Sequence, residues 1–544
     1  MKRALPVILF LPLLLTWPLA RVFTTRIVSE PSEEAAAHIW GLWAALEHRS
    51  PFVIETELLS FPDGGSLVLI DPANLLWYGL AGWLGPAAGF HAVVYGGVML
   101  LGVAGALLAR SVGGAPWLGA LVAMASPLTL SAASSGMTEM FGGGWVGIQL
   151  ALLLFFLRRP DPRVGLGVVL TLALAWLSGP YNGIWASIMD VFVVLGLARR
   201  RDWKGIGRAA GVGVGAALLV APWAWALLHG RPDDMPGSGH RAGLPAVVHL
   251  KNGFRGGLQA GTDLLDPWLP IQLTGGEAEI SRTAYIGVVV MVAAVLAVRR
   301  ERRLWPWLFG GAGFSVLSLG THVYVGGDPL HVAGRPLLAP AGMLTVMLPV
   351  FGRLVHWYRA GIGATLLLAP LVSRSRRGWL VAPLVVLDAL FLAPLQWPLP
   401  DAPVPDATPY ALLEGEGALL EVPAVMPRSP NRNSWREGTV LAQTGHGRPI
   451  AGTMMNLPMS RKAKRSRMAA RRLMNRGHLS AREYDFLLRL GFRWLVIHPQ
   501  YKQVTAQQRG NLVACLGEPI ADTDEVWIFD LAEGSGRDCI RDSQ

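Results

Sequence analysis

Charged side chains are scarce in this sequence of 544 residues. Asp, Glu, Lys and Arg make up 16% of it, whereas a soluble protein carries about a quarter, so the composition excludes an ordinary soluble domain. Cysteine is scarcer still: Cys515 and Cys539 are the only two, and they offer no metal-ligand spacing. No internal repeat is visible, which disfavours a transporter. Hydrophobic residues, in contrast, make up 52% of the chain, as in a membrane protein.

The formal net charge is +11, but the distribution of this charge argues against a nucleic-acid partner. Most Lys and Arg residues form short clusters between apolar runs, which is the positive-inside pattern of membrane proteins. Lys2 and Arg3 precede the first run, so we expect a cytoplasmic amino terminus. That run shows no small-x-small cleavage pattern, so we expect a retained helix rather than a signal peptide.

The apolar runs predict a mainly α-helical, multi-pass protein with about eleven transmembrane helices. The basic clusters between these helices all fall on the cytoplasmic side, so the chain starts inside and its last span ends outside. The predicted spans are residues 4–24, 86–109, 117–134, 145–157, 164–177, 183–198, 209–228, 284–298, 304–321, 361–372 and 379–395.

Three domain segments follow from the hydropathy. Residues 1–396 form the predicted transmembrane domain, with a first outer loop at 25–70, and 397–410 form a Pro-rich linker. Residues 411–544 are predicted to form an extracytoplasmic α+β domain, with strands at 418–422, 494–497 and 526–531 and helices at 467–475 and 481–490. Outside the cytoplasm Cys515 and Cys539 are permitted to pair, and two buried thiols are the alternative.

The first outer loop contains a predicted amphipathic helix that lies on the membrane surface. Ser32 suits an N-cap, and an apolar stripe follows at helical spacing, formed by Ile39, Leu42, Trp43 and Leu46. Glu34 and His38 lie one turn apart beside this stripe. Two interpretations stay open: a catalytic carboxylate, or an acid that complements the helix dipole in the first turn.

Several other residues stand out by position. Asp190 and Asp388 fall inside predicted spans, which indicates a function, a buried partner or a position nearer the interface. Glu139 lies at an outer turn, where it either lines a cavity or is solvated. A basic run covers residues 461–476, and it is either a solvated helix face or a contact for anionic lipid headgroups or an acidic glycan.

Short motifs occur in a recognisable order along the chain. They are Glu34-Ala-Ala-Ala-His38-Ile-Trp40, Phe61-Pro62-Asp63-Gly64-Gly65, Gly179-Pro180-Tyr181-Asn182-Gly183, Ser318-Leu319-Gly320, residues 348–353 with Tyr358-Arg359, residues 443–450 and residues 491–498. In this order the chain resembles the large bacterial multi-span proteins of the GT-C glycosyltransferase superfamily, which carry an acid-x-x-x-His-x-Trp loop and a C-terminal outer domain.

The resemblance implies an inverting glycosyltransferase in the bacterial inner membrane. A polyprenyl-phosphate sugar would be the donor, and an envelope glycan, lipid or protein would be the acceptor at the outer face. Glu34 stands where the family has Asp; it would act with His38 as the catalytic pair, either as general base or as a ligand of a divalent metal. The longer side chain of Glu34 shifts the carboxylate by more than an ångström, to which catalysis is sensitive.

The resemblance also implies a site for the donor phosphate. Arg353, His356 and Arg359 lie at the outer end of a predicted span, where the alternative role is snorkelling. Tyr181 matches a turn tyrosine of the family and would touch the sugar or phosphate; an interfacial belt position is the alternative. Glu139 would line the same cavity. The runner-up function is a non-catalytic protein that handles glycans or lipids on a GT-C-like scaffold.

His446 and His498, in the predicted outer domain, are interpreted as structural residues, because no third metal ligand stands at a recognisable spacing.

Overall fold

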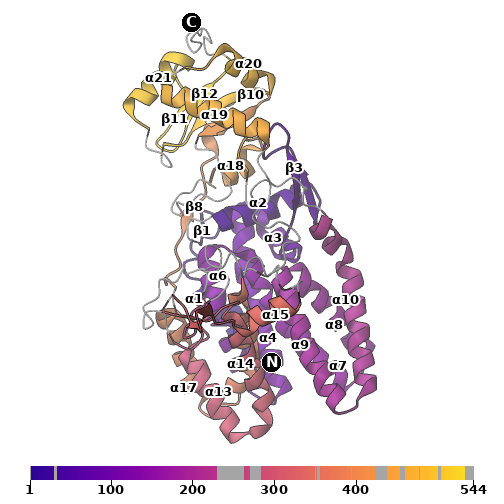
Figure 1. The fold of residues 1–544 in the computed structure, drawn as a ribbon. Coiled ribbons are helices and arrows are strands. Elements are labelled where there is room, and N and C mark those ends of the chain that lie inside the picture. Colours follow the sequence, from indigo (N-terminus) through magenta and orange to yellow (C-terminus); the bar gives the residue numbers. More distant parts are fainter. Residues whose placement is uncertain are drawn as a thin grey trace. The chain divides into compact units, whose positions relative to one another are not determined.

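The structure is a computed structural model, and its chain is mainly helical (Figure 1). It describes residues 2–29, 33–229, 262–269, 283–326, 328–348, 351, 354, 356–393, 395–422, 438–453, 460–476, 478–499 and 504–532. The chain divides into two compact units. Unit 1 comprises Met1–Glu30, Ile70–Trp225 and Ser238–Asp401, and unit 2 comprises Pro31–Leu69, Ala226–Gly237 and Ala402–Gln544.

Unit 1 is built from apolar helices, many of which begin with proline. Proline suits the first helical turn because its missing N–H would have no intrahelical partner there. The helices are α1 (Ala4–Leu15), α3 (Leu75–Ala81), α4 (Pro86–Ser111), α5 (Pro116–Met124), α6 (Pro127–Ser135), α7 (Gly143–Arg158), α8 (Pro162–Leu177), α9 (Pro180–Arg199), α10 (Trp203–His229), α13 (Val288–Arg300), α14 (Trp305–Ser318), α15 (Pro340–Met347), α16 (Gly361–Val372) and α17 (Gly378–Leu387).

Short elements connect these helices. The 3-10 helices include η1 (Pro72–Asn74), η2 (Gly82–Leu84), η3 (Thr138–Gly142), η6 (Arg302–Leu304) and η8 (Trp357–Ala360), and one π-helix, η9, covers Asp388–Leu392. Two small hairpins follow α14, formed by β4 (Tyr324–Val325) with β5 (Asp328–Pro329) and by β6 (His331–Val332) with β7 (Arg335–Pro336). Strand β1 covers Arg26–Ile27.

Four described helices are long and apolar enough to cross a membrane: Pro86–Ser111, Thr138–Arg158, Pro180–Arg199 and Trp203–Leu228. The bent pair α5 and α6, with 41° between its halves, makes a fifth if it is one span. Shorter apolar helices cover Ala4–Leu15, Pro162–Leu177, Trp357–Val372 and Gly378–Leu392. Every predicted span overlaps a described helix, but the number of crossings stays a prediction.

Helix α4 is the centre of unit 1 and packs against α1, α3, α5, α7 and α16. Glycines allow this close approach. A Cβ atom at Gly105 of α4 would lie 2.1 Å from the carbonyl oxygen of Gly119 of α5, and one at Gly97 would lie 2.2 Å from Cβ of Phe141. Small residues at such crossings let helix backbones come together where lipid supplies no hydrophobic drive. In contrast, only 22% of the most apolar stretch of α10 is buried, and the helix carries exposed apolar side chains.

Unit 2 contains a four-stranded sheet with the strand order β11-β12-β10-β9. Its strands are β9 (Ala418–Val422), β10 (Phe492–Ile497), β11 (Ala521–Asp522) and β12 (Trp527–Asp530). β9 and β10 are parallel, whereas β12 is antiparallel to both β10 and β11. β9 is buried along its whole length, as expected of a parallel strand with both faces covered. These positions confirm the predicted strands; the side of the membrane on which they lie stays a prediction.

Helices cover this sheet and close its core (Figure 1). They are α19 (Arg461–Arg476), α20 (Ala481–Arg489) and α21 (Ala506–Leu516). A fourth helix of unit 2, α18, comprises Gly438–His446. Capping boxes fix the starts of α20 and α21, where Ser480 pairs with Glu483 and Thr505 with Gln508. Further elements are β8 (Ala402–Pro403) and η10 (Thr408–Leu412). Cys515 is buried and disulfide-bonded, and Cys539 lies outside the described residues.

The remainder of unit 2 comes from early in the chain: α2 (Glu33–Glu47) and a hairpin of β2 (Val53–Thr56) with β3 (Gly65–Val68). The prediction of a surface helix is wrong for α2. Ile39, Trp40 and Leu42 are completely buried, and of the predicted stripe Leu46 is the exposed member. The reason is packing against α18, where Trp40 Nε1 donates to Gln443 Oε1 over 2.7 Å. The predicted cap Ser32 lies outside the described residues.

Candidate functional site

Four of the predicted substrate-binding residues belong to unit 1, and three of them meet around one guanidinium. Arg359 on η8 forms an ion pair with Glu139 on η3, and only 4% of Arg359 and 9% of Glu139 are exposed. The ring of Tyr181, in the first turn of α9, lies 4.7 Å from Cζ of Arg359. The fourth residue, His356, donates its backbone N–H to the Tyr181 hydroxyl over 2.9 Å.

The remaining donors of Arg359 contact weaker partners. Its Nε donates to the Tyr358 hydroxyl over 3.4 Å, and its Nη2 lies 3.6 Å from Sδ of Met137. A thioether sulfur is a weak acceptor compared with an anionic oxygen. Within the described part of unit 1, Nη1 of Arg359 therefore contacts the carboxylate of Glu139, whereas Nη2 contacts the sulfur of Met137.

A hydrogen bond to its backbone carbonyl holds Glu139, the acid of this pair, in place. Asn182 Nδ2 donates to the carbonyl oxygen of Glu139 over 2.7 Å, so α9 and η3 are tied together at the site. Gly179 precedes α9 with a φ of +139°, a value that side chains disfavour, and a Cβ there would lie 3.3 Å from that of Glu139. The Gly179-Pro180-Tyr181-Asn182 turn thus places a ring against Arg359 and an amide against the backbone of Glu139.

A second polar group adjoins η3, and it was not singled out as a site from the sequence. Asp71 is fully buried, and its Oδ2 accepts from Nδ2 of Asn74 over 2.8 Å and from the hydroxyl of Thr138. Asn74 also donates to the Thr138 carbonyl over 2.9 Å. Thr138 precedes Glu139 in the chain, so this group positions the start of η3. The one available signal was an Asp-Pro-x-Asn turn directly before an apolar helix.

The predicted catalytic pair belongs to unit 2. Glu34 and His38 are both on α2, where one turn of helix separates them, as the spacing predicted. His38 is buried, with 7% of its surface exposed. The side chain of Glu34 and all of Arg353 lie outside the described residues. The roles of these residues stay predictions.

The acids inside predicted spans have hydrogen-bond partners. Asp190 accepts from Nε2 of Gln149 at 2.8 Å through both oxygens, and Asp388 accepts from the Tyr285 hydroxyl at 2.6 Å and the Val289 N–H at 2.8 Å. These bonds favour the interpretation of buried partners over a reaction site.

The described residues contain no group of three or more His, Cys, Asp or Glu side chains that could hold a metal ion. His498 lies with Nε2 3.6 Å from an oxygen of the fully buried Glu421, and the ring of His446 stacks on Tyr410. Both histidines therefore pack within unit 2, in line with the structural role expected of them.

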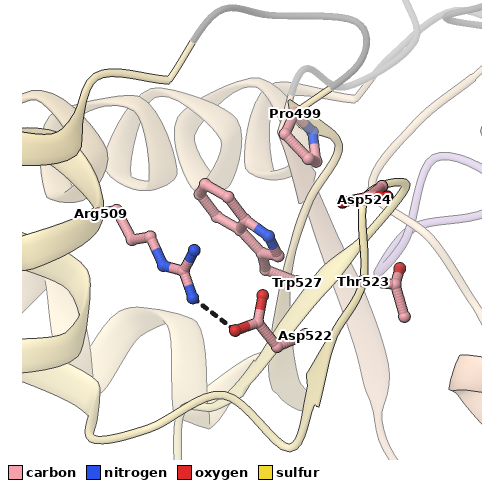
Figure 2. Close-up of a pocket in the computed structure, with 6 residues that line it drawn as sticks. All are labelled: Pro499, Arg509, Asp522, Thr523, Asp524 and Trp527. Atoms are coloured by element: carbon pink, nitrogen blue, oxygen red, sulfur yellow. Dashed lines mark hydrogen bonds and ion pairs between the residues drawn. The ribbon is translucent and has the colours of Figure 1, made fainter.

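One open pocket of about 560 Å³ lies in unit 2, at the end of its sheet (Figure 2). Arg509 forms an ion pair with Asp522 and lies 4.7 Å from the centroid of the Trp527 ring, and Pro499, Thr523 and Asp524 complete the lining. Because Trp527 also packs against the hydrophobic core, its two faces are not both open for stacking on a ring. None of the predicted site residues lines this pocket.

Comparison with solved structures decides the fold. The arabinofuranosyltransferase AftD from Mycobacteria matches with a TM-score of 0.59 at 15% identity, over 99% of this chain and 40% of that chain. The chain has a GT-C fold. It spans less than half of the AftD length. No family model matches the sequence, and no curated protein does.

Two further solved structures match with lower TM-scores. ArnT from Cupriavidus metallidurans matches with a TM-score of 0.43 at 13% identity, over 97% of this chain and 98% of that chain. An oligosaccharyltransferase from Archaeoglobus fulgidus, in a complex with Zn and sulfate, matches with a TM-score of 0.45 at 13% identity, over 93% of this chain and 69% of that chain. The match to AftD confirms the predicted resemblance to GT-C proteins as a fold.

Proposed function

We propose that this GT-C fold transfers a sugar from a polyprenyl-phosphate donor to an envelope acceptor at the outer face of the bacterial inner membrane. The observation that carries the proposal is the buried Arg359–Glu139 pair with the Tyr181 ring beside it. Inverting transfer needs a base at the acceptor hydroxyl and positive charge at the departing phosphate. The fold shared with AftD supports a membrane glycosyltransferase in general.

Arg359 is the proposed ligand of the donor phosphate. A guanidinium offers a planar fork of donors that suits phosphate oxygens, and its charge is worth most where water is excluded. The Nη2 edge that contacts Met137 would exchange a sulfur acceptor for a phosphate oxygen. Glu139 would keep the guanidinium oriented, while Tyr181 would hold it from the ring face.

Glu34 is the proposed general base, with His38 one turn behind it on α2. Inversion requires one base that takes the acceptor proton as the sugar–phosphate bond breaks.

The test uses the purified full chain in nanodiscs with polyprenyl-phosphate sugars and an envelope-lipid fraction as acceptor. Glu34→Gln should abolish glycan product, while Glu33→Gln, the adjacent acid on α2, should retain it. A Glu34→Gln variant with full activity would reject the base role. A Glu34→Asp variant that keeps or gains rate would place the carboxylate correctly.

The runner-up is a non-catalytic protein that binds a lipid-linked glycan on the same scaffold. Its support is that Arg359 is fully compensated by Glu139, as in a structural ion pair. Mass spectrometry of co-purified lipids separates the two functions when it is combined with turnover. A bound polyprenyl-phosphate sugar without product from any acceptor fraction would favour the runner-up.

A further inference from the structure

Helix α19 carries an unbalanced charge. Its sequence over Arg461–Arg476 contains eight Arg and Lys residues and no acid. Its apolar side is committed to the core of unit 2, where Ala469, Ala470, Leu473 and Met474 are buried. The packing fixes the rotation of the helix, so most of its cations must point away from the domain.

Few of these cations are neutralised inside the protein. Lys462 Nζ binds Oδ1 of Asp63 at 2.8 Å, and Arg472 binds Glu483 at 2.7 Å. Five further cations of the helix are exposed, and no ion pair joins these five to an acid among the residues that the structure describes: Arg461, Lys464, Arg465, Arg471 and Arg476.

Like charges crowd each other along this face. Arg461 and Arg465 are four residues apart, as are Arg467 and Arg471, and such pairs destabilise a helix. Burial lowers the pKa of Arg467, and the charge of Arg471 lowers it further. A partner that carries several negative charges would relieve this repulsion.

One apolar side chain lies in the middle of the cations. Met468 is 56% exposed, one turn from Lys464 on one side and from Arg471 and Arg472 on the other. An acidic polysaccharide would leave this thioether in water. A lipid headgroup layer satisfies both chemistries, because phosphates meet the cations and an apolar side chain enters the acyl boundary.

We infer that the exposed face of α19 binds anionic phospholipid headgroups through Arg461, Lys464, Arg465, Arg471 and Arg476, with Met468 inserted between them. The inference is independent of sugar transfer. Each basic residue near an anionic surface strengthens binding about fivefold, so the five residues together would strengthen it roughly three-thousandfold. Because the contact is electrostatic, salt weakens it.

The experiment places an environment-sensitive fluorophore at Met468→Cys in the full chain, reconstituted in nanodiscs of phosphatidylcholine with or without phosphatidylglycerol. The emission should shift to the blue only with phosphatidylglycerol and return in high salt. The matched control is the same label at Gln507→Cys, an exposed position on α21, where no shift is expected. Equal emission in both lipids, or equal shifts at both positions, would overturn the inference.

Charge removal supplies a second readout. Changing Arg461, Lys464, Arg471 and Arg476 together to Gln should abolish the shift, while the control Arg482→Gln/Arg489→Gln on α20 should keep it. Circular dichroism checks that both variants are folded. If soluble alginate shifts the label in phosphatidylcholine nanodiscs and phosphatidylglycerol does not, the face binds acidic glycans instead and the inference is wrong.

Discussion

Arg359 and Glu139 form a buried ion pair although 220 positions separate them in the chain. The pair joins η8 to η3, and Tyr181 of α9 covers the guanidinium from one face. Burying two charges costs desolvation energy that their attraction barely repays, so such a pair is weak evidence for a role in stability. Its retention in an apolar unit is more easily explained by a ligand that needs the cation.

Substitutions that remove one or both charges distinguish a structural role of the Arg359–Glu139 pair from a role in binding. Glu139→Gln leaves an uncompensated buried guanidinium and should destabilise unit 1 by about 3–5 kcal/mol. The double variant Arg359→Gln/Glu139→Gln carries no buried charge and should recover most of that loss in thermal unfolding. Donor-lipid binding should nevertheless be lost in the double variant, because Arg359, the proposed phosphate ligand, is absent. A double variant that binds donor lipid normally would remove Arg359 from the proposed phosphate site.

Tyr181 makes two contacts that substitutions can distinguish. Tyr181→Phe loses the hydrogen bond from the His356 N–H, at about 1 kcal/mol, but keeps the ring beside Arg359. Tyr181→Leu loses the cation–π contact as well, which is worth about 2 kcal/mol when desolvated. Donor affinity, measured by titration in nanodiscs, should therefore fall more for Leu than for Phe. Equal effects of the two variants would place the role of Tyr181 in its hydroxyl.

The pH dependence of unit 2 should report His446. Burial, with the nearby charges of Arg448 and His498, lowers the pKa of His446 to about 3 from its ordinary 6.5. Between these values the unfolded chain binds a proton that the folded unit does not. Stability is therefore complete above pH 6.5 and falls as the pH drops below it, by about 1 kcal/mol per pH unit.

Urea titrations that follow tryptophan fluorescence between pH 7 and pH 5 measure this loss. His446→Gln has no titrating ring, so its unfolding midpoint should depend less on pH than that of the wild type. The same slope in both proteins would assign the effect to another group.

Two glycines in different surroundings should respond in opposite directions to alanine. Gly119→Ala places a methyl group 2.5 Å from the Gly105 carbonyl oxygen, so it should destabilise unit 1 by about 1–3 kcal/mol. Gly213→Ala on α10 meets nothing within 4 Å and should stabilise by about 0.5–1 kcal/mol, because alanine loses less backbone entropy in a helix. Thermal unfolding in detergent compares them, and equal changes would contradict the close α4–α5 contact.

The helices and strands were predictable because their signals are local. Apolar runs with basic ends predict the helices of unit 1, and short runs of residues that favour strands predict β9, β10 and β12. The burial of α2 was not predictable, because Trp40 meets Gln443 at a distance of 403 positions in the chain. Arg359, Tyr181 and Glu139 could each be singled out by position, but their convergence depends on how η8, α9 and η3 pack. Asp71 was not singled out, because an Asp-Pro-x-Asn segment before a helix is typical of an ordinary turn.

The hydrogen bond between Trp40 and Gln443 also affects how the protein is made. The ribosome releases α2 and the β2–β3 hairpin before nearly all the apolar helices, while α18 emerges only after them. Until α18 has been synthesised, side chains of α2 that are buried in the folded chain, such as Ile39 and Trp40, lack some of their final neighbours. A chain that ends before Gln443 could never form this hydrogen bond, so the packing of α2 depends on a residue made 403 positions after Trp40.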